Sequence, residues 1–204
     1  MIAALFVETG GAYFGVPGVD PWDEARDARL YAGPWPVVAH PPCSRWCILA
    51  GFVESRFPEK KRGEDGGCFA AALASVRRWG GVLEHPAFTK AWPAYGLATP
   101  RRGWSAPDLH GGRVCALNQA AYGHSAPKAT WLYYVGVEPP SLRFDAVESA
   151  QSISTGLASR RLPAADGATK RRRAGGVELA SHKQRIATPP AFRDALLSLA
   201  RGAR

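Results

Sequence analysis

The sequence lacks a long apolar run, a basic leader and a dense set of cysteines. No stretch approaches the roughly 20 uninterrupted apolar residues of a membrane-spanning helix. The opening residues, MIAALFVETGGAYFG, carry none of the basic residues that begin a secretory signal peptide. Four cysteines in 204 residues are too few and too irregularly spaced for a disulfide framework, so free thiols are expected. These absences predict a soluble, cytoplasmic protein with no membrane partner.

The sequence also shows no internal repeat and no linker between two folded domains. A chain of 204 residues with 46% hydrophobic residues can bury one sizeable core. We predict an α/β core over residues 1–145 that would carry any catalytic site. A basic flexible segment over 146–180 follows, and a C-terminal helical motif over 181–204 is expected to pack back on the core.

Acidic residues are outnumbered by basic ones. The chain has 26 Lys and Arg against 17 Asp and Glu, a formal net charge of +9. Such a balance favours an acidic partner, most commonly nucleic acid, although a solvated basic surface is the alternative. The densest basic cluster, KRRR, lies in a Gly/Ala/Ser-rich stretch without hydrophobic periodicity. We expect these four residues to contact a DNA backbone: Lys170, Arg171, Arg172 and Arg173.

Short apolar runs alternate with helical patterns along the rest of the chain. This alternation is typical of an α/β fold with a mostly parallel sheet. The expected strands span residues 2–7, 36–39, 80–84, 113–117 and 130–136.

Three helices are expected. Asp20 is placed to cap a helix that starts at Pro21 and runs to about Tyr31. Apolar residues recur at helical spacing in CFAAALASVRRW, before a Gly-Gly pair ends the pattern. A third helix follows Pro189–Pro190.

Polar residues gather where three of the predicted strands end or begin. These segments, at 39–47, 83–92 and 117–136, contain a thiol, a carboxylate, three histidines and a lysine. In open α/β sheets, functional residues collect at the carboxyl ends of the strands. The candidate residues are Cys43, Glu84, His40, His85, His124 and Lys128.

Several of these residues fall in motifs with a recognisable order. The motifs are Pro41-Pro42-Cys43, Glu84-His85-Pro86, Tyr122-Gly123 through Lys128, and RIATPPAFRDALLSLA over 185–200. In this order they resemble the DNA cytosine-C5 methyltransferase superfamily, in a shortened form found among bacteriophage base-modification proteins. The resemblance covers about residues 2–140 and 185–200. It implies a compact Rossmann-like sheet with helices on both faces, DNA as partner and, for a phage protein, the host cytoplasm.

The resemblance also implies catalytic roles. A pyrimidine C5 becomes reactive when a thiolate adds at C6, and Cys43 is the expected nucleophile. Glu84 would hydrogen-bond the N3 or O4/N4 edge of the base. Backbone N–H groups of a helix starting after Cys43 would lower the pKa of its thiol. The remaining residues expected to bind substrate or phosphate are His40, Arg45, Trp46, His85, His124 and Lys128, with Trp46 stacking on a flipped base.

The chain departs from the superfamily where the cofactor binds. There the first strand leads to a glycine-rich loop for S-adenosylmethionine, but here Ala3 and Glu8 replace the usual Asp or Ser and a glycine. Only 23 positions separate Asp20 from Cys43, which leaves a reduced cofactor region. The target-recognition domain is missing as well. We therefore expect no S-adenosylmethionine and no metal.

A pyrimidine-activating thiol without a methyl donor suggests a base that carries its own leaving group. Some phages pyrophosphorylate 5-hydroxymethyluracil in DNA and then displace the pyrophosphate with an amino acid, a thymidine hypermodification. The enzymes of that last step are amino acid:DNA transferases. The leading hypothesis is a transferase of this kind, with DNA and a free amino acid as substrates.

Two other functions stay open at this point. The first is a compact S-adenosylmethionine-dependent DNA cytosine-C5 methyltransferase with a degenerate glycine loop. The second is a non-catalytic basic DNA-binding or anti-restriction module whose cysteines bind zinc. His40, Cys43 and Cys47 give a His-x2-Cys-x3-Cys spacing, but no fourth ligand lies nearby in the sequence.

Overall fold

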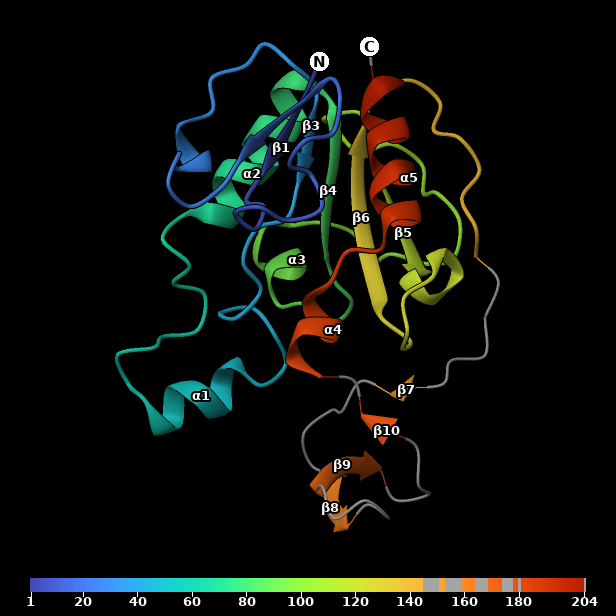
Figure 1. The fold of residues 1–204 in the computed structure, drawn as a ribbon. Coiled ribbons are helices and arrows are strands. Elements are labelled where there is room, and N and C mark those ends of the chain that lie inside the picture. Colours follow the sequence, from blue (N-terminus) through green and yellow to red (C-terminus); the bar gives the residue numbers. More distant parts are fainter. Residues whose placement is uncertain (145–150, 153–158, 164–168, 174–177, 180, 204) are drawn as a thin grey trace.

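A six-stranded mixed sheet forms the centre of the computed structural model, which describes residues 1–144, 151–152, 159–163, 169–173, 178–179 and 181–203 (Figure 1). The strand order is β2-β1-β3-β4-β6-β5. The strands are β1 Ile2–Leu5, β2 Val19–Trp22, β3 Val37–Ala39, β4 Gly81–Pro86, β5 Gly112–Asn118 and β6 Ala129–Val135. The chain is therefore α/β, as the sequence predicts.

The sheet is less parallel than expected. Strands β2, β1, β3 and β4 run parallel to their neighbours, whereas β6 is antiparallel to both β4 and β5. The ten residues 119–128 between β5 and β6 explain this difference. A parallel crossover needs a dozen or more residues, so a shorter connection leaves β6 to run back alongside β5. The sheet is mixed, with one parallel half and one antiparallel half.

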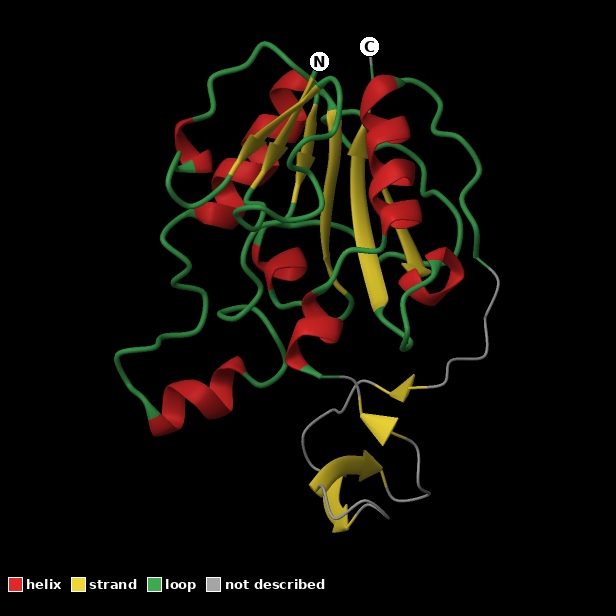
Figure 2. Cartoon of the chain, viewed as in Figure 1, coloured by secondary structure: helices red, strands yellow, loops and turns green. Residues whose placement is uncertain are grey.

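Helices cover both faces of the sheet, as predicted. Helix α2, Cys68–Trp79, packs Phe69 and other apolar residues against one face. Helix α5, Pro190–Arg201, packs Phe192, Leu196 and Leu199 against the other (Figure 2). Both helices agree with the apolar spacing in the sequence. The result is a three-layer arrangement with two separate apolar clusters.

Alternation along the strands decides which cluster each residue joins. In β3, Val37 and Ala39 face the α2 layer, and Val38 faces the α5 layer. In β4, Leu83 faces the α2 layer and Val82 the α5 layer. Because successive side chains of a strand point to opposite faces, the polar residues that follow are assigned to the two layers in the same way.

The helix expected over residues 21–31 is wrong. Residues Val19–Trp22 form β2, which pairs with the free edge of β1, and only a 3-10 turn, η1 Ala28–Leu30, follows. Asp20 accepts hydrogen bonds from the Trp22 indole and the Arg26 guanidinium instead of capping a helix. The hydrogen bonds of the sheet edge outweigh the local helix signal, because β1 would otherwise expose unpaired backbone groups.

Short elements complete the described chain. They are α1 Ala50–Arg56, α3 Ala91–Ala94, η2 Gln119–Tyr122, α4 His182–Ile186, β7 Gln151–Ser152, β8 Ser159–Pro163, β9 Thr169–Arg173 and β10 Glu178–Leu179. The last four strands form a second sheet in the order β7-β10-β9-β8. This sheet falls within the segment 146–180 that the sequence predicts to be basic and flexible, and the rest of that segment lies outside the described residues. Among the described helices, none has the length and apolar character needed to cross a membrane.

Candidate active site

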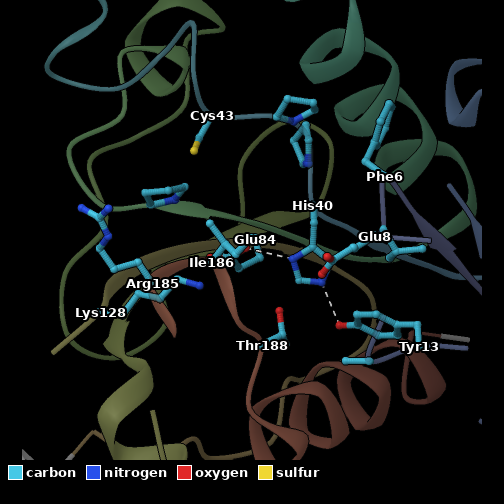
Figure 3. Close-up of a pocket in the computed structure, with 15 residues that line it drawn as sticks. Phe6, Glu8, Tyr13, His40, Cys43, Glu84, Lys128, Arg185, Ile186 and Thr188 are labelled. Atoms are coloured by element: carbon cyan, nitrogen blue, oxygen red, sulfur yellow. Dashed lines mark hydrogen bonds and ion pairs between the residues drawn. The ribbon is translucent and has the colours of Figure 1, made fainter. Parts of the chain in front are cut away.

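A cavity of about 430 Å³ opens at the carboxyl ends of β1, β3 and β4. From β1 the chain passes to β2 on one side and later to β3 on the other, so this edge is a topological switch point. Such points are where open α/β sheets bind ligands. Four of the predicted site residues line the cavity together, namely His40, Cys43, Glu84 and Lys128 (Figure 3).

Glu84 and His40 are held together by the strand register. Ala39 of β3 pairs with Leu83 of β4, so the next residues of the two strands are neighbours on the α5 face. His40 Nδ1 lies 2.9 Å from Glu84 Oε2. Gln119 Nε2 donates to Glu84 Oε1 at 3.2 Å. The carboxylate is therefore fixed from two sides.

The electrostatics favour an ionised Glu84. Burial alone would raise the pKa of this carboxyl group, but the hydrogen bond and charge of His40 and the charge of Lys128 lower it below its usual value. At neutral pH the side chain is a carboxylate that only accepts hydrogen bonds. Glu84 is 8% exposed and reaches the cavity.

Tyr13 extends this network, and no motif in the sequence singles it out. Its hydroxyl lies 2.7 Å from His40 Nε2. The ring is 3% exposed, and burial together with the negative charge of Glu84 raises the pKa of Tyr13 well above its usual value. Tyr13 belongs to the loop after β1, which stands out in the sequence only as an altered glycine-rich loop. The phenol, the imidazole and the carboxylate form one continuous hydrogen-bonded chain.

Cys43 points its sulfur into the cavity (Figure 3). The predicted lowering of its pKa does not occur: burial, with the charges of Glu84 and Cys47, raises the pKa of the thiol, and Lys128 opposes this less strongly. No helix begins directly after Cys43, because the N–H groups of Trp46 and Cys47 donate to the Cys43 carbonyl in a turn and α1 starts only at Ala50. The thiol is therefore protonated before substrate binds.

Two cations lie at the cavity wall. Lys128, just before β6, donates from Nζ to the Ala187 carbonyl oxygen at 3.1 Å. Arg185 of α4 also lines the cavity, with Thr188 after it. Arg185 opens the closing Pro-Pro-and-helix motif but was not predicted to be a site residue. The two positive charges come from segments that lie far apart in the sequence.

The structure places His85 in the core rather than in the cavity. The side chain is 0% exposed and packs between Phe69 and Trp92. Neither ring nitrogen has a hydrogen-bond partner among the described residues. Burial lowers the pKa of His85 from 6.5 to about 4, so the ring is neutral. A neutral imidazole enclosed by aromatic rings does not contact phosphate.

Trp46 is also a core residue. Its ring is 7% exposed and packs against Phe69 and Tyr95, and its Nε1 donates to Asp65 Oδ2 at 2.7 Å. The indole is therefore not available to stack on a flipped base. Its hydrogen bond to Asp65 instead anchors the segment that leads into α2, because Asp65 also accepts from the Phe69 N–H.

Arg45 and His124 do not line the cavity. Arg45 is half-buried, and its carbonyl oxygen accepts from the Gly63 N–H. His124 is buried, with Nδ1 2.7 Å from the Ala126 carbonyl oxygen, and burial lowers its pKa. These residues shape the loops that precede α1 and β6. Of the residues predicted to bind substrate or phosphate, only His40 and Lys128 line this cavity.

A second cavity of about 690 Å³ adjoins the first. The two share lining residues on the turn after β1 and at Pro42. Phe6 lies on this shared wall with a φ of 58°, a left-handed conformation that is uncommon for a bulky residue. The charged residues that line the second cavity are Glu8, Asp23, Glu24, Asp27 and Arg29. The region beside β1 therefore retains a cavity even though the chain there is short.

The basic cluster Lys170–Arg173 lies in β9, in the second sheet, and not at the cavity. In the described part of the chain, no three His, Cys, Asp or Glu side chains are grouped so that they could hold a metal ion. No family model, curated protein or solved structure matches the chain. Function is therefore inferred from the cavity and from the motifs that line it.

Proposed function

We propose that the chain is a DNA base-modifying transferase that attacks a pyrimidine at C6 through Cys43. One observation carries the proposal: a thiol, an ionised carboxylate and two cations converge on one cavity at the switch point of the sheet. The thiol supplies a nucleophile, the carboxylate a fixed acceptor, and the cations a site for phosphate. This combination matches the requirements of covalent chemistry on a nucleotide.

The ionisation of Glu84 favours a uracil-type base. A carboxylate offers about four lone-pair sites, of which His40 and Gln119 use two. The N3–H of a uracil ring is a donor that fits the remaining sites. The N3 of cytosine is an acceptor and would require a protonated Glu84, which the lowered pKa opposes. The proposed substrate base is therefore a 5-substituted uracil.

The proposed leaving group is pyrophosphate on the 5-methylene of the base. The Cys43 thiol releases its proton to water and its sulfur adds to C6, which makes C5 electron-rich; the thiolate that departs in the last step takes a proton back from water. The C5-methylene then expels pyrophosphate, and the cations of Lys128 and Arg185 stabilise the departing anion. The exocyclic carbon accepts the nitrogen of an amino acid, the nitrogen loses a proton, and the sulfur leaves C6 to restore the ring double bond. The net reaction exchanges pyrophosphate for an amine without a methyl donor.

The second cavity gives the amino acid a place beside the first. The carboxylates of Glu8, Asp23 and Glu24 suit the ammonium group of an incoming amino acid, whereas Arg29 already forms an ion pair with Asp27. The shared wall at Phe6 and Pro42 joins the two cavities. The amine would therefore reach the exocyclic carbon from the side of β1.

DNA is the proposed macromolecular partner. The net charge of +9 and the cluster Lys170–Arg173 on β9 support binding to phosphates. Register in the second sheet also brings Arg160 and Arg161 of β8 opposite Arg172 and Arg171.

Replacing Lys170–Arg173 with alanine should flatten the salt dependence of DNA binding, by about 0.9 in log–log slope for each phosphate that the cluster neutralises. An unchanged slope would remove this cluster from the DNA interface.

The first test uses DNA that contains 5-pyrophosphoryloxymethyluracil. After incubation with the protein and a mixture of amino acids, intact-mass and nucleoside analysis should show an amino-acid adduct. Cys43→Ala should abolish it, and Cys47→Ala, which removes a thiol that does not line the cavity, should leave it. Adduct formation by Cys43→Ala, or a requirement for S-adenosylmethionine, would contradict the proposal.

A second candidate function is supported by the size of the cavity beside β1. A compact C5 methyltransferase would use that cavity of about 690 Å³ for S-adenosylmethionine, whose sulfonium cation also suits carboxylates. A parallel reaction with S-adenosylmethionine and ordinary DNA distinguishes the two activities. A methyl adduct in that reaction would establish the methyltransferase, and no adduct in either reaction would favour the non-catalytic DNA-binding module.

A further inference from the structure

The hydrogen-bonded chain from Tyr13 to Glu84 has a defined direction. Glu84 is an ionised acceptor, so the Nδ1 atom of His40, 2.9 Å away, carries the proton between them. The relay uses the neutral form of the ring, in which the other nitrogen, Nε2, is an acceptor. In that form the Tyr13 hydroxyl, 2.7 Å from Nε2, donates to His40. Each member of the chain is polarised toward the carboxylate.

Tyr13 is the end of this chain that remains open to a ligand proton. Both ring nitrogens of His40 already have partners. The Tyr13 oxygen donates its own proton to His40 but keeps acceptor lone pairs, and the residue lines the cavity. It sits on the loop after β1, whose first residues Phe6 and Glu8 line both cavities, and Tyr13 itself lines the first (Figure 3). An N–H group that enters the first cavity along this loop is placed to donate to this oxygen.

We propose that Tyr13 is a catalytic residue that accepts the proton lost by the attacking amine, with His40 and Glu84 drawing the charge inward. This inference rests on the proposed function, because it assigns a role in the amine-transfer step. Tyr13 is absent from the site residues predicted from the sequence. The imidazole is here a relay, whereas its position in the sequence predicts a phosphate contact.

The step balances without another reactant. Attack of the amine on the exocyclic carbon forms a C–N bond and leaves an extra proton on nitrogen. That proton passes to the Tyr13 oxygen as the Tyr13 proton passes to His40 Nε2, so the phenol is never a free phenolate. The imidazolium is stabilised by the Glu84 carboxylate at 2.9 Å and later releases its proton to water. The Cys43 sulfur departs from C6 as a thiolate.

Burial makes this concerted route necessary. Tyr13 is 3% exposed, and its pKa lies well above the usual value, so a free phenolate would be costly. The charged groups around the chain are Lys128 before β6 and Arg193 and Asp194 on α5, together with Glu84. Arg193 and Asp194 act on Tyr13 with opposite sign. The charge that changes during proton transfer is therefore the one shared by His40 and Glu84.

The test separates the amine step from the steps before it. Tyr13→Phe removes one oxygen and keeps the ring, and Tyr95→Phe, away from the cavity, is the matched control. Three single-turnover rates are measured on pyrophosphoryl-activated DNA: pyrophosphate release without amine, capture of the best amino acid, and capture of its thiol analogue. The thiol analogue loses its proton in solution and attacks as a thiolate, so it needs no proton acceptor in the protein.

Tyr13→Phe should slow amine capture by about 100-fold, a typical contribution of general base catalysis. Pyrophosphate release and thiolate capture should stay within about twofold of the wild-type rates, because neither uses the relay. A parallel loss of all three rates would show that Tyr13 only supports the fold and would overturn the proposal, as would unchanged amine capture. If the wild-type protein releases no pyrophosphate, the proposed function itself fails, and the role of Tyr13 fails with it.

Discussion

Two neighbouring strands end in the same dipeptide and place it in opposite environments. His40-Pro41 follows β3, and His85-Pro86 ends β4. His40 bonds to a carboxylate and a phenol at the cavity. His85 has no hydrogen-bond partner among the described residues and packs against aromatic rings. The same dipeptide therefore places one histidine in a hydrogen-bonded chain and the other in the apolar core.

The parity of the strand explains the difference. His40 shares the α5 face with Val38, while His85 shares the α2 face with Leu83, because side chains alternate along a strand. The α5 face ends at the cavity, where Tyr13 lies. The α2 face ends in an aromatic cluster. The role of the histidine in such a motif therefore cannot be predicted unless the face of the sheet on which it lies is known.

The largest expected effect comes from removing the negative charge of Glu84, the carboxylate that bonds to His40. Glu84→Gln keeps a side chain of the same shape but cannot stabilise an imidazolium or hold the base edge as an anion. The single-turnover rate of amine transfer should fall by about 1,000-fold, the upper range for loss of one preorganised electrostatic group. A rate within tenfold of wild type would show that the carboxylate charge does not distinguish the two histidines.

A direct comparison of the histidines should give the next largest effect. His40→Gln should slow amine transfer by a few hundred-fold, because proton transfer through the ring is lost, a loss within the range of about 100- to 10,000-fold for acid–base groups. His85→Phe should leave the rate within about twofold, because that ring packs against aromatic rings and does not line the cavity. Both rates are measured on the same activated DNA. Similar losses in the two variants would contradict the assignment of roles by strand face.

Burial of His85 should make the free energy of unfolding depend on pH. The pKa of His85 is about 4 when folded, against a reference value of 6.5. Between these pH values the unfolded chain binds more protons, so the free energy of unfolding falls as the pH decreases. The loss from this residue should reach roughly 2 kcal/mol at pH 5 relative to pH 7.

Urea unfolding at pH 7 and pH 5 measures this loss. In His85→Phe the difference between the two pH values should shrink by the same amount, because the ring that titrates is gone. An equal pH dependence in the two proteins would mean that His85 already has an ordinary pKa.

The smallest expected effect comes from replacing Gln119, which holds the Glu84 carboxylate through the oxygen that does not bond to His40. Gln119 is 1% exposed and donates to Glu84 Oε1 at 3.2 Å and to Thr130 Oγ1 at 2.9 Å. Gln119→Leu should lower the free energy of unfolding by about 1 kcal/mol through loss of these hydrogen bonds. Equilibrium urea unfolding at neutral pH measures the change. An unchanged midpoint would show that Glu84 is held by His40 alone.

The sequence was informative where a local signal and the tertiary context agree. Helices α2 and α5 follow the spacing of their apolar residues, and the strands β1, β3, β4, β5 and β6 follow their apolar runs. The helix expected over residues 21–31 does not form, because β2 pairs instead with the edge of β1, an edge that a local sequence pattern does not reveal. The antiparallel half of the sheet depends likewise on the length of one connection.

The site was predicted in part for a similar reason. Cys43 follows β3, Glu84 lies near the end of β4 and Lys128 precedes β6, so their place at one edge could be inferred from the sequence. Tyr13 and Arg185 come from a loop and from the segment before α5, and only the folded chain brings them to the cavity. His85 was assigned to the cavity by its position in the sequence, and the strand register moved it into the core.

The wall formed by Arg185 and Thr188 has a consequence for synthesis of the protein. These residues follow Cys43 by more than 140 positions, and Lys128 holds the same segment through the Ala187 carbonyl oxygen. A domain generally folds as a unit during synthesis. The nucleophile is therefore made early, but its cavity stays open on one side until the segment around α4 has emerged. A nascent chain would hold the thiol long before it could retain a substrate.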